Sequence, residues 1–134
     1  MSPPRTITRE EMIAFARQYD PQPFHLDDEA ARTTLFEGLA ASGWHTAALS
    51  MRLCVASDFR PAGGILGIGG ELTWLKPVRP DDTLRARFMI VEAIPSRSKP
   101  DRGVLKTFTE MVNQHDEVVL TMRGLGMFGR RPPG

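Results

Sequence analysis

The feature that most constrains the fold is residues 41–59, "ASGWHTAALSMRLCVASDF", a long and almost uncharged apolar segment. Apolar side chains cover most of its helical circumference, and Arg52 is its only charge before Asp58. A helix of that composition is buried on nearly all sides. We therefore expect a helix that follows Ser42, whose hydroxyl suits the N-cap, and that ends near Ser57 or Asp58. The rest of the chain must cover it.

Strand patterns dominate after the glycine-rich run "RPAGGILGIGG". Four segments show partial alternation with a period of two, and turn formers separate them: residues 71–78, 82–94, 103–114 and 117–128. In the second segment one face is expected to be apolar, and it consists of Leu84, Ala86, Phe88 and Ile90. Helices that precede strands favour the α+β class. We expect a curved antiparallel sheet around the apolar helix.

Two shorter helices are expected before the apolar one. Thr8 and Glu11 have the spacing of a capping box, and apolar residues then recur at helical intervals, which predicts a helix over about residues 9–19. Asp27 can cap a second short helix, because the acidic residues after it suit a helix N-terminus.

Between these helices, two prolines bring an acid and an imidazole close together. Pro21 and Pro23 predict a stiff extended bend over residues 20–24, with His25 just before the second helix. Such a bend can hold Asp20 and His25 at a fixed separation, as general acid–base chemistry on a bound water requires. From the residues alone the alternative stays open, since Asp before Pro is common in turns and a His near an N-cap often bonds to backbone.

Composition bounds the class of protein. At 134 residues, with 41% hydrophobic and 25% charged residues, the chain is expected to form one globular domain over residues 1–134, with a disordered tail from about residue 129. The 17 basic and 16 acidic side chains nearly balance, which argues against nucleic acid as a partner. A single cysteine, Cys54, and the lack of a long apolar leader or membrane-length segment favour a cytoplasmic protein with no membrane partner.

Gly43 is the second candidate for chemistry. It opens the apolar helix, where unpaired N–H groups and the positive end of the dipole point outward, and a missing side chain would let a substrate carbonyl approach. An ordinary helix start with a tolerated glycine is the alternative. Trp44 and His45 follow as residues that could line a pocket.

Four signatures together resemble one family. "FARQYDPQPFHLDDEAA", "ASGW", "LTWLKPVRPDDTL" and "RSKPDRGVLKTFTEMVNQHDEVV" are similar, in order and over roughly residues 7–128, to the MaoC-like dehydratases and (R)-specific enoyl-CoA hydratases, which have the hotdog fold. The resemblance implies reversible syn hydration of a trans-2-enoyl thioester to a 3-hydroxyacyl thioester. It also implies that Asp20 and His25 act on the catalytic water and that the Gly43 N–H binds the thioester carbonyl.

The resemblance further implies an acyl-CoA or acyl-ACP substrate, no resident cofactor beyond that thioester, and a homodimer or an assembly of dimers. We expect substrate contacts from residues of the bend, the helix start and a basic turn: Gln22, Phe24, Ser42, Trp44, His45, Arg97 and Lys99. The basic turn is either a solvated loop or, with Arg130 and Arg131 as a second option, a site for coenzyme A phosphates. No metal is expected, because His25 and the acids after it do not form a specific zinc pattern.

The chain departs from the family pattern at several positions. Gln22-Pro23, with Pro21 added, replaces the usual Asn-Pro, and Ser42 stands where many relatives have His. Met51 replaces a supporting Ser of some hydratases. Asp81 replaces the glycine of a Pro-Gly-Asp turn, and we expect the turn to survive because Asp tolerates positive φ.

Two other functions stay open. Thioester hydrolysis occurs on the same fold, but it usually needs an acid on the central helix, and no carboxylate lies between Gly43 and Ser57. A non-catalytic acyl-thioester-binding or scaffolding subunit is the other, and it is favoured by the departures at Gln22, Ser42 and Met51.

Overall fold

The computed structural model describes residues 2–56, 65–95 and 102–129. Four helices and five strands occupy them in a helices-first order: β1 (Arg5–Thr6), α1 (Arg9–Tyr19), α2 (Pro23–Leu26), α3 (Asp28–Ala31), α4 (Gly43–Ala56), β2 (Ile65–Trp74), β3 (Thr83–Pro95), β4 (Arg102–Val112) and β5 (Val118–Gly129). The α+β class is confirmed. Arg97, Lys99, Arg130, Arg131 and most of the expected tail lie outside the described residues, while residue 129 belongs to β5.

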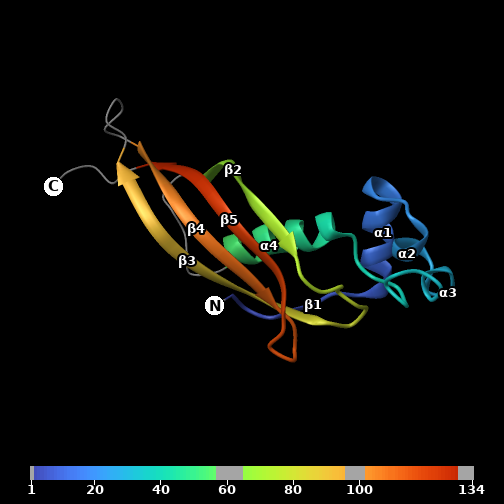
Figure 1. Ribbon diagram of the computed structural model, residues 1–134. Coiled ribbons are helices and arrows are strands. Elements are labelled where there is room, and N and C mark those ends of the chain that lie inside the picture. Colours follow the sequence, from blue (N-terminus) through green and yellow to red (C-terminus); the bar gives the residue numbers. More distant parts are fainter. Residues whose placement is uncertain (1, 57–64, 96–101, 130–134) are drawn as a thin grey trace.

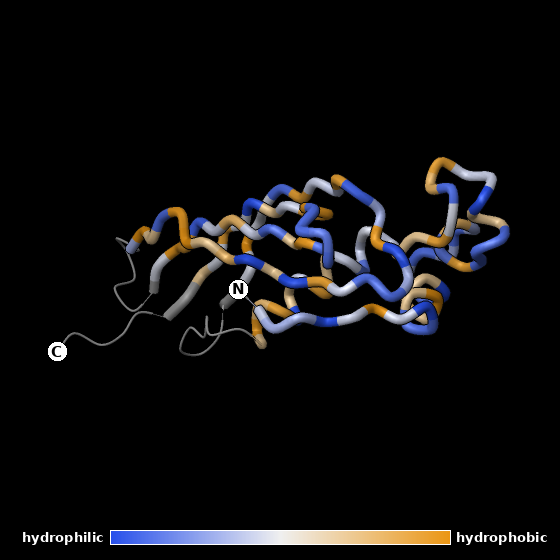
Figure 2. The backbone as a smooth tube through the Cα atoms, turned by 90° about the horizontal axis from the view of Figure 1, so that it is seen from below, coloured by the Kyte–Doolittle hydropathy of each residue, from blue (hydrophilic) through white to orange (hydrophobic). Residues whose placement is uncertain are grey.

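The strands form one antiparallel sheet in the order β1-β3-β4-β5-β2. Figure 1 shows long, curved strands with α4 along one face, while α1, α2 and α3 gather at one end. In Figure 2 hydrophobic and hydrophilic residues alternate along the strands, as expected for a sheet with one covered face. The end of the molecule where α1–α3 meet the start of α4 is where the expected site residues lie.

The core fills the space between α4, α1 and the sheet. Its members are buried apolar side chains from each of these elements, among them Met12, Leu49, Leu53, Leu84, Met111 and Leu120. Each side chain of this size stabilises the fold by about 1.5–3 kcal/mol when it leaves water. The capping box of α1 is present, since Thr8 Oγ1 accepts from the Glu11 N–H at 3.2 Å and Glu11 Oε1 accepts from the Thr8 N–H at 2.9 Å.

The turn between β2 and β3 keeps the shape expected for it. Asp81 has φ = 68°, the left-handed value that a glycine would adopt easily. Asp82 holds the turn from the next position, because its Oδ2 accepts from the Arg79 N–H at 2.8 Å. Aspartate therefore replaces glycine here without loss of the turn.

Three local predictions were wrong. Residues 20–24 are not extended throughout, because Pro23 starts a helical turn, α2, that includes His25. Proline suits that first position, where its fixed φ fits a helix and its missing N–H is not needed.

The glycine run belongs partly to β2, because pairing with β5 overrides the low strand propensity of glycine. A bulge separates Gly67 from Gly69 in this strand. In β3 the apolar face ends at Ile90, which is 54% exposed next to a bulge.

The helix α4 is also less buried than predicted. Its apolar residues Trp44, Met51 and Val55 are 59%, 47% and 54% exposed. They recur at helical spacing on one face, whereas Leu49 and Leu53 face the core. The sheet of a single chain covers only one side of the helix, so an apolar stripe stays open.

Candidate active site

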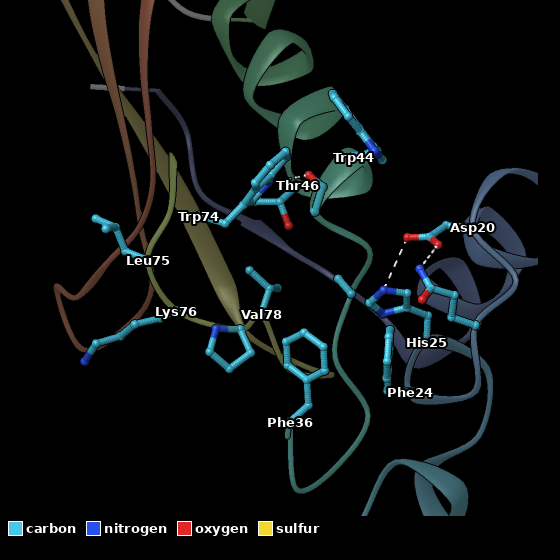
Figure 3. Close-up of a pocket in the computed structure, with 14 residues that line it drawn as sticks. Asp20, Phe24, His25, Phe36, Trp44, Thr46, Trp74, Leu75, Lys76 and Val78 are labelled. Atoms are coloured by element: carbon cyan, nitrogen blue, oxygen red, sulfur yellow. Dashed lines mark hydrogen bonds and ion pairs between the residues drawn. The ribbon is translucent and has the colours of Figure 1, made fainter. Parts of the chain in front are cut away.

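A cavity of ≈ 470 Å³ lies at the start of α4, between α2 and the end of β2. Six residues expected at the site line it: Asp20, Gln22, Phe24, His25, Gly43 and Trp44. Figure 3 shows Asp20 and His25 pointing toward each other at one side and Trp74 lying over the helix start at the other. The bend and the helix start, far apart in sequence, thus share one cavity.

Asp20, at the C-cap of α1, accepts hydrogen bonds from two neighbours. Ser42 Oγ donates to its Oδ2 at 2.7 Å, and Gln22 Nε2 donates to its Oδ1. Burial raises the pKa of Asp20, but the hydrogen bonds from Gln22 and Ser42 and the nearby His25 outweigh it, so the pKa lies below the ordinary value for a carboxyl group. Asp20 is therefore a carboxylate, a hydrogen-bond acceptor only, at neutral pH.

His25 is buried, and its tautomer follows from one contact. Its Nδ1 lies 2.7 Å from the carbonyl oxygen of Ala40, which can only accept, so Nδ1 carries the proton. Its Nε2 lies 3.3 Å from Asp20 Oδ2. The rings of Phe24 and Phe36 pack around the imidazole, with centroids 4.6 Å and 5.9 Å away.

When Nε2 carries no proton, these contacts leave two acceptors side by side at the edge of the cavity. In this Nδ1–H form His25 presents the lone pair of Nε2 and Asp20 presents a carboxylate oxygen, so neither donates to the other. A water molecule has two hydrogens and can donate one to each. In this form the arrangement can orient a water with an oxygen lone pair directed away from both residues.

Gly43 begins α4, and Trp74 explains why the position is small. A Cβ at Gly43 would lie 2.7 Å from Trp74 Cε2 and Nε1, and Trp74 Nε1 donates to the Gly43 carbonyl at 2.8 Å. The space beside its Cα is thus filled by the indole rather than left open for a substrate. Among the described residues no acceptor bonds the Gly43 N–H, which stays available as a first-turn donor.

Two of the expected substrate contacts lie elsewhere. Ser42 is fully buried and flanks α4, its carbonyl accepting from the Thr46 N–H at 3.2 Å while its hydroxyl supports Asp20. His45 faces away from the cavity and stacks on Phe15 at 4.6 Å and 8°, and its Nδ1 has no hydrogen-bond partner in the described part of the chain. Burial lowers the pKa of His45, and this effect and that of Arg5 exceed the opposing effect of Glu11.

Several lining residues had no signal in the sequence. Phe36 lies in an irregular loop, and Lys76, which pairs with Glu117, follows β2. Trp74, at the end of β2, lines the cavity and meets Trp44 edge-on at 5.3 Å. Contacts between distant segments bring these residues to the site, such as the bond from Trp74 Nε1 to the Gly43 carbonyl.

A second cavity of ≈ 380 Å³ lies farther along α4, between the helix and the sheet. It is mostly apolar, and small residues of β2 and β5 line it: Gly67, Gly69, Gly124 and Gly126. Met51 from the helix and Phe88 from β3 close its sides. Because glycine has no side chain, these positions leave a space that larger residues would fill.

Among the described residues no group of three or more His, Cys, Asp or Glu side chains is arranged to hold a metal ion. In the same parts of the chain every helix is too short or too polar to span a bilayer.

Comparison with known proteins identifies the family. The family model for the MaoC like domain matches residues 1–112. The chain belongs to the MaoC-like family. The fold agrees: a crystal structure of the MaoC-like dehydratase from Rhodospirillum rubrum is similar with a TM-score of 0.94 and 46% identity, covering 98% of this chain and 90% of that one. The hotdog fold predicted for this MaoC-like chain is thereby confirmed.

Two curated proteins are also similar to this MaoC-like domain. The uncharacterized protein YdeM of Bacillus subtilis is 34% identical over 112 residues, 82% of this chain and 77% of that protein. The (R)-specific enoyl-CoA hydratase of Rhodospirillum rubrum is 27% identical over 99 residues, 69% of this chain and 64% of the enzyme. These similarities support an enzyme of the hydratase or dehydratase type.

Proposed function

We propose that this MaoC-like domain catalyses the reversible syn addition of water to a trans-2-enoyl thioester, giving a 3-hydroxyacyl thioester. The observation that supports this most directly is that Asp20 Oδ2 and His25 Nε2 lie 3.3 Å apart at the edge of a cavity. In the proposed reaction the water oxygen attacks C3 while one of its protons passes to this pair. The C2=C3 electrons move toward the thioester, and the pair then passes that proton to C2 on the same face, which restores Asp20 and His25.

The Gly43 N–H is the proposed donor to the thioester oxygen as negative charge develops there. Two features favour this role: the N–H belongs to the first turn of a 14-residue helix, and it has no acceptor among the described residues. A preorganised donor of this kind lowers a barrier by about 3 kcal/mol in other enzymes. Because α4 is anchored in the core, the donor needs little reorganisation during the reaction.

We further propose that the carrier is coenzyme A or acyl carrier protein and that the acyl chain reaches the second cavity along α4. The mostly apolar, glycine-lined wall of that cavity suits a hydrocarbon chain. Carrier phosphates would then lie toward the opening of the first cavity, where Lys76 stands. Arg97 and Lys99 stay predictions for this role.

A homodimer is part of the proposal. Trp44, Met51 and Val55 form an exposed apolar stripe on α4. The strand β2 is at an edge of the sheet formed by the described residues, with main-chain groups open to pairing. An apolar helix face beside an unpaired strand edge favours a second copy of the chain as the cover.

One assay distinguishes this activity from the two alternatives. Purified protein is mixed with crotonyl-CoA while the enoyl absorbance, free thiol and tryptophan fluorescence are recorded. A hydratase removes the enoyl absorbance, yields 3-hydroxybutyryl-CoA and releases no thiol. Thiol release without a hydroxyacyl intermediate would instead identify a thioesterase, and a fluorescence change without turnover would identify a binding subunit. Both tryptophans line the first cavity, so fluorescence reports its occupancy.

A further inference from the structure

Arg79 lies between β2 and β3, and its guanidinium reaches back to the loop that precedes α4. Its Nη1 donates to the carbonyl oxygens of Gly38 at 2.8 Å and Leu39 at 3.2 Å, and its Nη2 donates to that of Phe36. These carbonyls belong to an irregular loop and have no ladder or helix to satisfy them. A planar guanidinium with five N–H donors can bind all three, which a lysine ammonium cannot do in the same geometry.

Neither an ion pair nor the substrate cavity accounts for Arg79. Within residues 2–56, 65–95 and 102–129 its guanidinium meets no carboxylate, whereas Arg5, Arg9 and Arg87 each do. Arg79 does not line the first cavity, although its neighbour Val78 does. Its side chain is thus committed to the loop backbone.

Ala40 follows the loop residues that Arg79 binds. Hydrogen bonds fix the N–H groups of Ala40 and of both its neighbours. The Leu39 N–H donates to Asp28 Oδ1 at 2.9 Å, and the Ala40 N–H donates to the Phe24 carbonyl at 3.0 Å. The Ala41 N–H donates to the Val78 carbonyl at 2.8 Å. The loop is therefore clamped between the segment that carries Arg79 and the segment that carries His25.

The Ala40 carbonyl is the group that accepts from His25 Nδ1 at 2.7 Å. Arg79 binds the preceding carbonyl, that of Leu39, so a single residue separates the guanidinium contact from the imidazole contact. A shift of this loop would remove the acceptor that favours a proton on Nδ1. The ring could then carry its proton on Nε2, donate to Asp20 and lose its place as an acceptor for water.

We propose that Arg79 is a positioning residue, which holds the Ala40 carbonyl in place and so keeps His25 in the Nδ1–H tautomer with Nε2 open to the water. This inference rests on the proposed hydratase function. Arg79, in the motif "KPVRPDD", would thus influence the reaction through His25, although its side chain touches neither substrate nor water.

The test measures the tautomer as well as the rate. Full-length protein labelled with ¹⁵N-histidine is compared with Arg79→Met, Arg79→Lys and the control Arg85→Met, which removes an exposed arginine of β3. Ring ¹⁵N shifts of His25, assigned with His25→Ala, report which nitrogen is protonated. Crotonyl-CoA hydration gives kcat and KM for the same samples.

For Arg79→Met we expect a mixture of tautomers and a kcat lowered about 10- to 100-fold with KM nearly unchanged, since the substrate contacts remain. Arg79→Lys should recover part of both, and Arg85→Met should match the parent protein. A folded Arg79→Met with His25 wholly in the Nδ1–H form and kcat within about twofold of the parent would overturn the proposal. If Arg79→Met does not fold, the same criteria apply to Arg79→Lys. If the parent hydrates no enoyl thioester, the proposed function fails, and the tautomer alone decides the role of Arg79.

Discussion

The two ends of α4 are built on opposite principles. At its start the polar side chains are fixed by specific contacts: Asp20 accepts from Ser42 and Gln22, and His25 donates to the Ala40 carbonyl. Farther along, the helix borders a cavity of ≈ 380 Å³ whose wall consists largely of glycines and apolar side chains. The first end fixes the positions of the proposed reacting groups. The second end provides space for a substrate chain but few polar groups that would orient it.

The difference shows how one helix can contribute both to catalysis and to the choice of substrate by size. Hydrogen-bond geometry at the first end tolerates little change, because a carboxylate and an imidazole must both face one water. Side-chain volume at the second end can change without moving those groups, since the cavities lie about separate parts of the helix. Substitutions at the first end should therefore change the rate, and those at the second should change the choice of substrate.

The largest effect is expected for Asp20→Asn. The amide keeps the size of the side chain but removes the negative charge and one of the two acceptors for water. Hydration of crotonyl-CoA should fall about 10³-fold, the scale of a positioned acid or base. The matched control is Asp116→Asn, in an exposed turn where Asn tolerates the positive φ of 59°. Equal activity of Asp20→Asn and the control would show that the Asp20 carboxylate takes no part in the reaction.

A smaller loss is expected for Gly43→Ala. The new methyl group would lie 2.7 Å from the Trp74 indole and must displace the ring or shift the start of α4. We expect hydration to fall about 10- to 100-fold and tryptophan fluorescence to change. In Gly67→Ala the same methyl group meets no atom within 4 Å and lies at the second cavity, so this control should keep the parent spectrum and the parent rate with crotonyl-CoA. A Gly43→Ala protein that keeps both would show that the helix start is not closely packed.

At the other end, Gly124→Ala should sharpen the comparison by changing substrate choice alone. A Cβ there would lie 3.0 Å from Thr107 Oγ1, which can rotate away, and it would reduce the second cavity. We expect kcat/KM to fall about 10-fold for the longest enoyl-CoA that the parent accepts and to stay unchanged for crotonyl-CoA. A uniform loss across an enoyl-CoA length series would show that the two ends are not independent.

The smallest effect concerns His45, the one polar side chain at the first end whose buried Nδ1 has no partner in the described residues. Burial, the main cause, holds its pKa below the ordinary value in the folded state, so the unfolded chain binds a proton more readily. The free energy of unfolding should fall as pH drops below about 6.5, by at most about 1.4 kcal/mol per pH unit, and level off below the folded pKa. Urea unfolding of His45→Phe, which keeps the stacking on Phe15, should lack this slope.

Sequence patterns predicted the order of the elements and the residues of the site better than they predicted the tertiary contacts around that site. The Thr8–Glu11 box, the Asp27 cap and the Asp81 turn are local, because each depends on residues within a few positions. The resemblance of "YDPQPFH" and "SGW" placed Asp20, His25 and Gly43 in one cavity, as the structure does.

The remainder depends on contacts between distant segments. Trp74 reaches Gly43 across 31 residues, and Arg79 reaches Phe36 across 43, with no periodicity to indicate either. The strand character of the glycine run comes from pairing with β5, so propensity alone misjudged it. The exposure of Trp44, Met51 and Val55 was missed because an all-round apolar helix was expected to be covered within one chain.

The most direct test of the central claim is a crystal structure of the protein with a 3-hydroxybutyryl thioester bound. We expect the 3-hydroxyl oxygen to lie within hydrogen-bond distance of both Asp20 Oδ2 and His25 Nε2, in the position of the added water. The thioester oxygen should accept from the Gly43 N–H. A thioester bound with its 3-hydroxyl away from Asp20 and His25, or with its carbonyl away from the start of α4, would contradict the account.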